Sequence, residues 1–177
     1  MIDGNEYDFR RTYKAKWKWP REKFANAGRK LKIGEITSLP YQITPQHAAM
    51  LLWCNGGVPA KNIYSSKKHY FEVREFLGFG TNWDLTDTIL RFRDCLPRYS
   101  VPVALLDDGG LGDLAFLLTF PGCRDERENK VWYFTWFHEG DPEDPNDPRM
   151  LIEVAPTLKQ FVDGLRESPL KNRTPPG

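Results

Sequence analysis

The segment that most constrains the fold is residues 131–138, which reads VWYFTWFH. Alternation along a strand would divide its aromatic side chains between the two faces, with Tyr133 and Phe137 on one and Trp132, Phe134 and Trp136 on the other. A strand with large apolar side chains on both faces needs cover on both sides. We therefore expect this strand to lie within a sheet that is packed on both faces.

Residues 44–57 carry the start and stop signals of a helix. Thr44 can cap the first turn, and Pro45 fits the first helical position because its missing N–H has no partner to lose there. The Asn-Gly pair that follows supplies a left-handed stop. The predicted helix is apolar on nearly all sides, so we expect it to be largely buried. We interpret His47, near its start, as a surface or capping-turn histidine.

Two more helices are predicted by a capping residue followed by apolar residues at helical spacing. Asp84 can cap the first, which ends at Pro97 and has the apolar positions Leu85, Ile89, Phe92 and Leu96. Thr157 can cap the second, whose apolar positions are Leu158, Phe161, Val162 and Leu165. Both patterns indicate amphipathic helices that bury one side.

Strands are predicted between these helices. Residues 70–80 have the β-branched and aromatic content of a strand, with alternation through Phe71 and Val73 that extends to Glu75. Residues 101–106 and 114–119 read as the arms of a hairpin, because the Asp-Asp-Gly-Gly segment between them has turn chemistry. A short strand at residues 150–154 would pair back onto the sheet. The order of elements predicts an α+β fold, a central and mainly antiparallel sheet flanked by helices.

The chain length of 177 residues fits a single domain. We divide it into a basic, aromatic N-terminal extension (1–32), a folded domain (33–168) and a flexible tail (169–177). The formal charge of +1 argues against a dedicated nucleic-acid-binding protein with a strongly basic surface. Residues 9–32, however, hold ten bases and one acid, whereas residues 107–153 hold twelve acids and four bases. We expect a charge dipole, and either segment could face a charged partner or simply be solvated.

Three cysteines without a CxxC pair make a disulfide framework improbable by count and favour a reducing, cytoplasmic location. No apolar run is long enough for a membrane span. The sequence contains none of the nucleophile-elbow, HExxH, phosphate-loop or paired-CxxC motifs. The acidic, proline-rich residues 139–148 lack the glycine and distal glutamate of an EF-hand loop. We therefore expect a binding protein and not an enzyme, with no cofactor and no metal.

Four motifs, in order, resemble those of the SUKH superfamily of Smi/Knr-like proteins. They are LLWCNGGVP at residues 51–59, VPVA with DDGG at 101–110, VWYF to HE at 131–139, and the closing helix at 158–165. The resemblance implies the SUKH fold, a sheet flanked by helices, and no catalytic residues. Bacterial members act as immunity proteins of polymorphic toxin systems, each of which binds and silences a cognate toxin, often a nuclease. Fungal members are regulatory scaffolds.

The hypothesis is that this chain is a monomeric immunity protein whose acidic and aromatic surface binds a basic toxin. Acids over a nuclease cleft would block its substrate and speed the encounter. The expected contact residues are Asp107, Asp108, Glu139, Asp141, Glu143 and Asp144, with Trp83 or Trp136 as an aromatic anchor. Core packing is the alternative role for both tryptophans. The rival functions are a regulatory scaffold, a nucleic-acid-associated protein that uses the basic extension, and a metal-dependent hydrolase.

Overall fold

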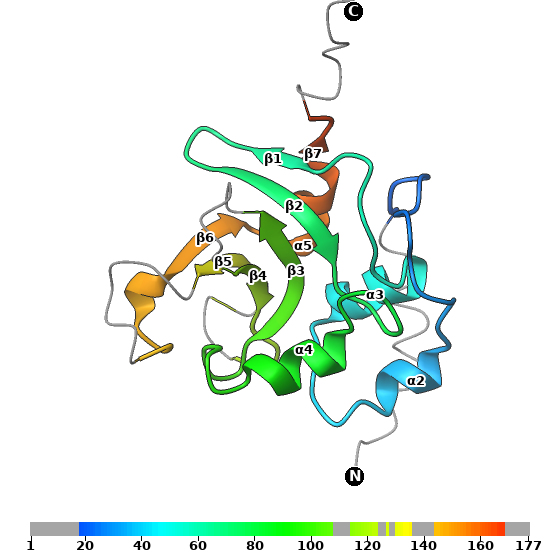
Figure 1. Ribbon diagram of the computed structural model, residues 1–177, viewed down its shortest axis with the longest axis horizontal. Helices are drawn as coiled ribbons and strands as arrows, with labels where there is room; N and C mark the ends of the chain where they lie inside the picture. The colour runs from blue at the N-terminus through cyan, green and yellow to red at the C-terminus, as the bar shows by residue number, and fades with distance from the viewer. Residues whose placement is uncertain (1–17, 108–113, 124–126, 128–129, 136–143, 169–177) are drawn as a thin grey trace, which may run out of the picture.

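The computed structural model describes residues 18–107, 114–123, 127, 130–135 and 144–168. These residues form a curled, seven-stranded antiparallel sheet with strand order β6-β5-β4-β3-β2-β1-β7 (Figure 1). The strands are β1 (Ile63–Ser65), β2 (Tyr70–Phe76), β3 (Val101–Asp107), β4 (Ala115–Thr119), β5 (Val131–Thr135), β6 (Leu151–Ala155) and β7 (Leu165–Arg166). The helices are α2 (Ile33–Thr37), α3 (Pro45–Trp53), α4 (Leu85–Phe92) and α5 (Leu158–Asp163), and the 3-10 turn η1 (Pro148–Met150) precedes β6. The predicted α+β class is confirmed.

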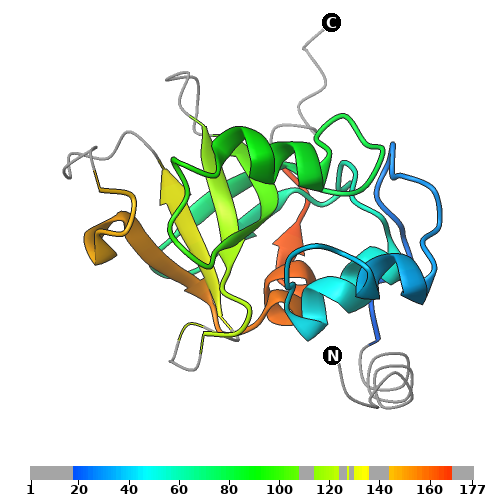
Figure 2. The same ribbon diagram turned by 90° about the horizontal axis from the view of Figure 1, so that it is seen from below.

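The sheet is covered on both faces, as the aromatic strand required (Figure 2). One face, which we call the α5 face, packs Val73, Leu106 and Leu117 in a cluster with Phe161 of α5. The other, the α4 face, packs Leu105, Phe116 and Phe134 in a second cluster, to which Phe92 of α4 adds its ring. The Phe92 and Phe116 ring centroids are 5.3 Å apart. Alternation along β5 follows the prediction, since Tyr133 joins the α5 face and Phe134 the α4 face.

The predicted helix starts are confirmed by their caps. Thr44 Oγ1 accepts a hydrogen bond from the backbone N–H of His47 at 3.3 Å, and Pro45 opens α3. Asp84 accepts from the N–H groups of Thr86 and Asp87 at the start of α4. Thr157 accepts from the N–H of Gln160 in α5 at 3.1 Å. Each cap satisfies backbone donors that a helix leaves unpaired in its first turn.

Three short elements were not predicted, and two helices end earlier than expected. α2, β1 and β7 have five, three and two residues, which is too few for a periodic pattern. α4 ends at Phe92, before Leu96. α5 ends at Asp163, and Leu165 pairs with Tyr64 of β1 as part of β7. α5 therefore carries the chain from β6, at one edge of the sheet, to β7, at the other.

The interpretation of His47 as a surface histidine is wrong. Its backbone lies in the capping turn, but its side chain is fully buried. Neither ring nitrogen has a hydrogen-bond partner among the described residues. Burial lowers the pKa of His47 to about 3, because the charged imidazolium would be desolvated there. Burial therefore keeps the imidazole neutral. The burial of α3 that its apolar content predicted includes this histidine.

Residues 18–32 pack against the domain. Trp19 stacks on Trp53 of α3 at 5.6 Å between ring centroids, and Phe24 stacks on Phe76 of β2 at 4.7 Å. Phe24 and Leu31 are both buried. The bases Lys18, Arg21, Lys23, Lys30 and Lys32 of this segment are exposed. In this stretch the aromatic side chains dock on the domain while the basic ones reach the surface.

Asn55 joins three separate stretches of chain, an arrangement that we call the Asn55 junction. Its Nδ2 donates to the carbonyl oxygens of Arg29 at 2.9 Å and Phe79 at 2.8 Å, and its Oδ1 accepts from the N–H of Phe79 at 2.7 Å. Asn55 is only 3% exposed. Next to it, Gly57 has φ +106°, and a Cβ there would lie 2.5 Å from the Ala25 carbonyl oxygen. The Asn-Gly-Gly motif is therefore required by this close approach of backbones.

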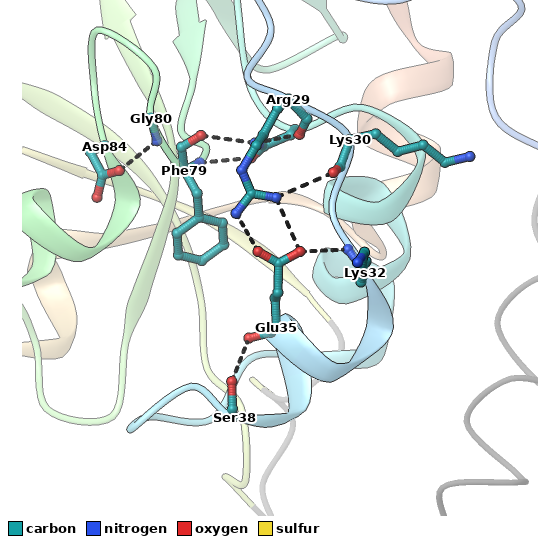
Figure 3. Close-up of polar contacts among 9 residues, drawn as sticks. Arg29, Lys30, Lys32, Glu35, Ser38, Phe79, Gly80 and Asp84 are labelled. Atoms are coloured by element: carbon teal, nitrogen blue, oxygen red, sulfur yellow. Dashed lines mark hydrogen bonds and ion pairs between the residues drawn. The ribbon is translucent and has the colours of Figure 1, made fainter.

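An ion pair lies beside the junction at the start of α2. Arg29 forms a two-pronged bond with Glu35 (Figure 3), and one prong, from Nη1 to Oε2, measures 3.1 Å. Glu35 Oε2 also accepts from the N–H of Lys32 at 2.8 Å, which completes a capping box. The Arg29 hydrogen bond and then the Lys32 N–H lower the pKa of Glu35 to about 2. Both partners are at the surface, so the pair orients α2 more than it stabilises the fold.

Within the described part of the chain, no helix is both long enough and apolar enough to cross a bilayer. Cys54, Cys95 and Cys123 all fall in this part and are not joined by a disulfide.

Candidate partner-binding surface

Three of the predicted contact residues lie in the described part of the chain. Asp107 is the last residue of β3 and is exposed. Trp83 is half-buried and packs against both the α4-face cluster and the cluster that includes Leu77 and Leu85. Asp144 is exposed in the turn before η1, where its Oδ1 accepts from the N–H of Asn146 at 2.9 Å.

The other predicted contact residues, Asp108, Trp136, Glu139, Asp141 and Glu143, lie outside the described residues. Of the three that are described, Asp107 and Trp83 both adjoin β2, whereas Asp144 precedes β6, three strands away from β3 in the sheet. Two of the three described contact residues therefore lie at or beside β2 and β3.

The residue opposite Asp107 is an acid that sequence reasoning missed. In the β2–β3 ladder, Glu72 pairs directly with Asp107. Side chains of directly paired residues lie on the same face of a sheet, and two like charges in that position destabilise the pair. The N–H donor Nδ2 of Asn62 bonds to Glu72 Oε1 at 2.8 Å, which fixes that carboxylate. The two acids thus place two carboxylates on the same face at the end of the strand pair.

A third carboxyl group, that of Glu75, lies further along the same strand. The alternation predicted Glu75 on the face of Phe71 and Val73, which is wrong. The register shifts between Val73 and Glu75, and this bulge leaves Glu75 opposite Leu105 on the α4 face. A bulge adds one residue to one strand, so every side chain after it changes face.

Glu75 is buried, with 5% of its surface exposed. Desolvation raises the pKa of its carboxyl group, while the backbone N–H of Trp83 and the charge of Arg74 oppose that change. Its Oε1 atom has no hydrogen-bond partner among the described residues. A buried polar atom without a partner is uncommon in native proteins and calls for an explanation.

Tyr70 completes this surface. It stands two positions before Glu72 on β2, so alternation places it on the same face, and it is 61% exposed. We call Tyr70, Glu72, Glu75 and Asp107 together the carboxylate face. It runs along β2 from an exposed aromatic ring, past two opposed carboxylates, to a buried carboxyl group beside Trp83.

The α5 face of the same strand ends is apolar. Phe71 stacks on Tyr133 at 4.9 Å between ring centroids, and His69 stacks on Phe71 at 5.7 Å. A hollow of about 300 Å³ lies at this end of the sheet, lined by Tyr70, Phe71, Glu72, Leu106, Asp107, Ala115 and Tyr133. One end of the sheet thus offers stacked rings on one side and acids on the other.

The remaining hollows differ in character. One of about 280 Å³ lies where residues 20–24 meet α5, and its rim holds the exposed bases Arg21, Lys23 and Lys61 together with Glu22 and Asp163. Another, of about 420 Å³, is lined by residues 36–45 with Pro121 and Gly122 and is mostly apolar.

The carboxylate face suits the binding of an organic cation. Carboxylates accept hydrogen bonds at four lone-pair positions each, and an exposed tyrosine ring attracts cations at its face. Among the described residues, no three His, Cys, Asp or Glu side chains are grouped so as to hold a metal ion.

Comparisons of the chain with family models, with curated proteins and with solved structures found no match. The resemblance to the SUKH superfamily thus rests on the four motifs in the sequence.

Proposed function

We propose that this chain is a non-catalytic protein-binding domain of the SUKH type that serves as an immunity protein, and that it neutralises a basic toxin by binding it at the carboxylate face. The observation that carries the proposal is the direct pairing of Glu72 with Asp107 beside the exposed ring of Tyr70. The pairing places two carboxylates on the same face at the end of the strand pair. A cationic partner would be attracted to both of them.

The rest of the surface fits such a partner. Aromatic side chains and charged groups dominate the energetics of protein interfaces, and both occur at this end of the sheet. Acids gathered at one place also accelerate the encounter with a basic protein through long-range attraction. The bases Arg21, Lys23 and Lys61 line a separate hollow, where residues 20–24 meet α5.

The test uses the full chain and the product of the gene next to its own, which an immunity function predicts to be a toxin. Co-expression should restore growth, and the purified proteins should associate. Replacing Glu72 by Lys should slow association by about tenfold or more and flatten its dependence on salt concentration. Stopped-flow fluorescence at several ionic strengths measures both quantities.

Glu22→Lys is the matched control, because it makes the same charge change at an exposed position away from the carboxylate face. Equal association rates for the Glu72→Lys and Glu22→Lys variants would show that the carboxylate face does not bind the toxin. If the neighbouring product shows no toxicity and no binding, the immunity function is wrong.

A further inference from the structure

We propose that Tyr99 anchors a self-association surface, on which its ring packs against the same turn of a second copy of the chain. The inference is independent of the proposed function, because it concerns a different surface from the carboxylate face. It replaces the monomer expected from the sequence. It depends on the backbone of Tyr99, the exposure of its ring and the charges beside it.

Tyr99 has a backbone conformation that does not suit a large side chain. It is the third residue of the turn at residues 97–100, between α4 and β3 (Figure 1), and has φ +63°. A type II turn needs a positive φ at this position, where Gly or Asn is usual, and a bulky residue there is strained. Strain of this kind persists where the surroundings hold it, and it is common at functional positions.

Hydrogen bonds on two sides hold the turn in place. The carbonyl oxygen of Pro97 accepts from the N–H of Ser100 at 3.1 Å and from its Oγ at 2.6 Å. The N–H of Arg98 donates to Asn146 Oδ1 at 2.8 Å, which ties the turn to the segment before η1. The turn is therefore fixed before a partner arrives, so little conformational freedom is lost when the ring is covered.

The ring of Tyr99 contributes little to the packing of the domain. It is 75% exposed, more than Tyr70 at 61% and Leu90 at 62%, the other exposed large apolar residues of the described structure. It has no stacking contact or hydrogen bond within the described part of the chain. The isolated fold thus explains neither the conformation nor the exposure of this side chain, whereas tyrosine is among the residues that dominate the energetics of interfaces.

The charges beside Tyr99 favour a second copy as the partner. Arg98 is exposed and has no ion pair among the described residues. Asp144 is exposed on the other side of Asn146, which donates to its Oδ1 from the backbone N–H at 2.9 Å and from Nδ2 at 3.2 Å. A uniformly acidic or basic partner would meet one like charge here. A two-fold axis beside Tyr99 instead brings each Arg98 toward Asp144 of the second copy.

A nucleic acid strand fits this surface less well. Its phosphate groups would meet the carboxylates of Asp144 and Asp147, and Arg149 is already paired with Asp147. The surface is also small, and small contacts between proteins are weak. We therefore expect a dimer that dissociates with a Kd of about 0.1–1 mM.

The experiment measures the molar mass of the full chain by sedimentation equilibrium at concentrations from about 20 μM to about 1 mM. We expect the weight-average mass to rise with concentration toward that of a dimer. Tyr99→Ala should weaken the association about tenfold or more, because it removes the anchor from both copies. Tyr99→Phe keeps the ring and should retain most of the association.

A charge exchange tests whether the partner is a second copy. Arg98→Asp and Asp144→Arg should each weaken the association about fivefold or more, because each variant places like charges opposite one another. The double variant again pairs opposite charges across the two-fold axis and should recover most of the wild-type association. Arg21→Asp and Glu22→Arg make the same charge changes at the hollow beside α5 and should leave it unchanged.

Urea denaturation separates association from folding. Glycine takes a positive φ without strain, so Tyr99→Gly should be at least as stable as the wild type although it no longer associates. A Tyr99→Gly variant that lost stability together with association would show that Tyr99 stabilises the fold, and the inference would be wrong.

A chain that stays monomeric over the whole concentration range would overturn the inference. Association that persists in Tyr99→Ala, or that the double charge variant fails to recover, would overturn it as well. None of these results bears on the proposed function, which fails by a different result, namely association with the toxin that is indifferent to Glu72→Lys.

Discussion

The Asn55 junction lies beyond the end of β2, whereas the opposed acids Glu72 and Asp107 lie nearer its start, and the two places differ in how their polar groups are satisfied. At the junction, the Asn55 amide bonds to three backbone groups of Arg29 and Phe79, and the site is sealed from water. At the carboxylate face, Glu72 and Asp107 oppose each other, and Glu75 leaves a buried oxygen without a partner among the described residues.

The difference separates two reasons for placing polar residues in a sheet protein. Groups that hold the fold are satisfied within the chain, because an unpaired buried group costs free energy. Polar groups at the carboxylate face are met only in part by the described residues, since Glu72 accepts a bond from Asn62 whereas Glu75 Oε1 has no donor there. The comparison leads to three measurable expectations.

The largest effect is expected at the junction. Asn55→Ala removes the partners of two carbonyl oxygens and one N–H group, and each buried unsatisfied group costs about 1–3 kcal/mol. We expect the free energy of unfolding to fall by about 3–5 kcal/mol, as measured by urea denaturation. Asn82→Ala, at an exposed position in the loop before α4, should change it by about 0.5 kcal/mol or less. Equal losses in the two variants would contradict the role given to Asn55.

The second effect depends on pH. The folded-state pKa of Glu75 is raised, so its contribution to stability is complete below its unfolded pKa, near 4.5, and is lost as pH rises through the folded pKa. Glu75→Gln removes that loss. The variant should match the wild type at pH 4 and exceed it at pH 8, because only the wild type loses stability as the buried carboxyl ionises. Urea denaturation at both pH values measures this, and an advantage that is the same at both would exclude ionisation as its cause.

The smallest effect is expected at the opposed pair. Glu72→Gln keeps an acceptor oxygen for Asn62 and removes the repulsion across the ladder. We expect a gain of about 0.2–1 kcal/mol in the free energy of unfolding at pH 7 and low salt, which diminishes as salt is added. A loss of stability instead would show that the two acids are not in conflict in the isolated domain, and the contrast with the junction would weaken.

Much of the fold could be predicted because its signals are local. Thr44, Asp84 and Thr157 satisfy the first turns of their helices, and such caps are legible within a few residues of sequence. The aromatic residues on both faces of the strand at 131–135 predicted a sheet covered on both faces, and the structure has one. Short elements such as β7 form only because a partner strand is already in place, so they carry no periodic signal.

The site was harder to predict because it depends on pairing between strands. Asp107 was expected as a contact residue, but its neighbour Glu72 becomes visible only from the register of β2 on β3. The bulge at Arg74 changed the face of Glu75, and one extra residue in a strand leaves no mark in composition. His47 was misplaced for a related reason, since its burial depends on the elements packed against α3.

The path of α5 from one edge of the sheet to the other also bears on how the protein is made. β1 acquires its outer neighbour only when β7 arrives, and β7 is separated from β1 by about a hundred residues of sequence. A ribosome delivers β7 after every other strand of the described sheet. Until then the nascent sheet exposes the β1 edge and the rings of Tyr64 and Phe76, against which Phe161 of α5 packs. The sheet is complete only when β7 pairs with β1, and contacts this distant in sequence slow folding.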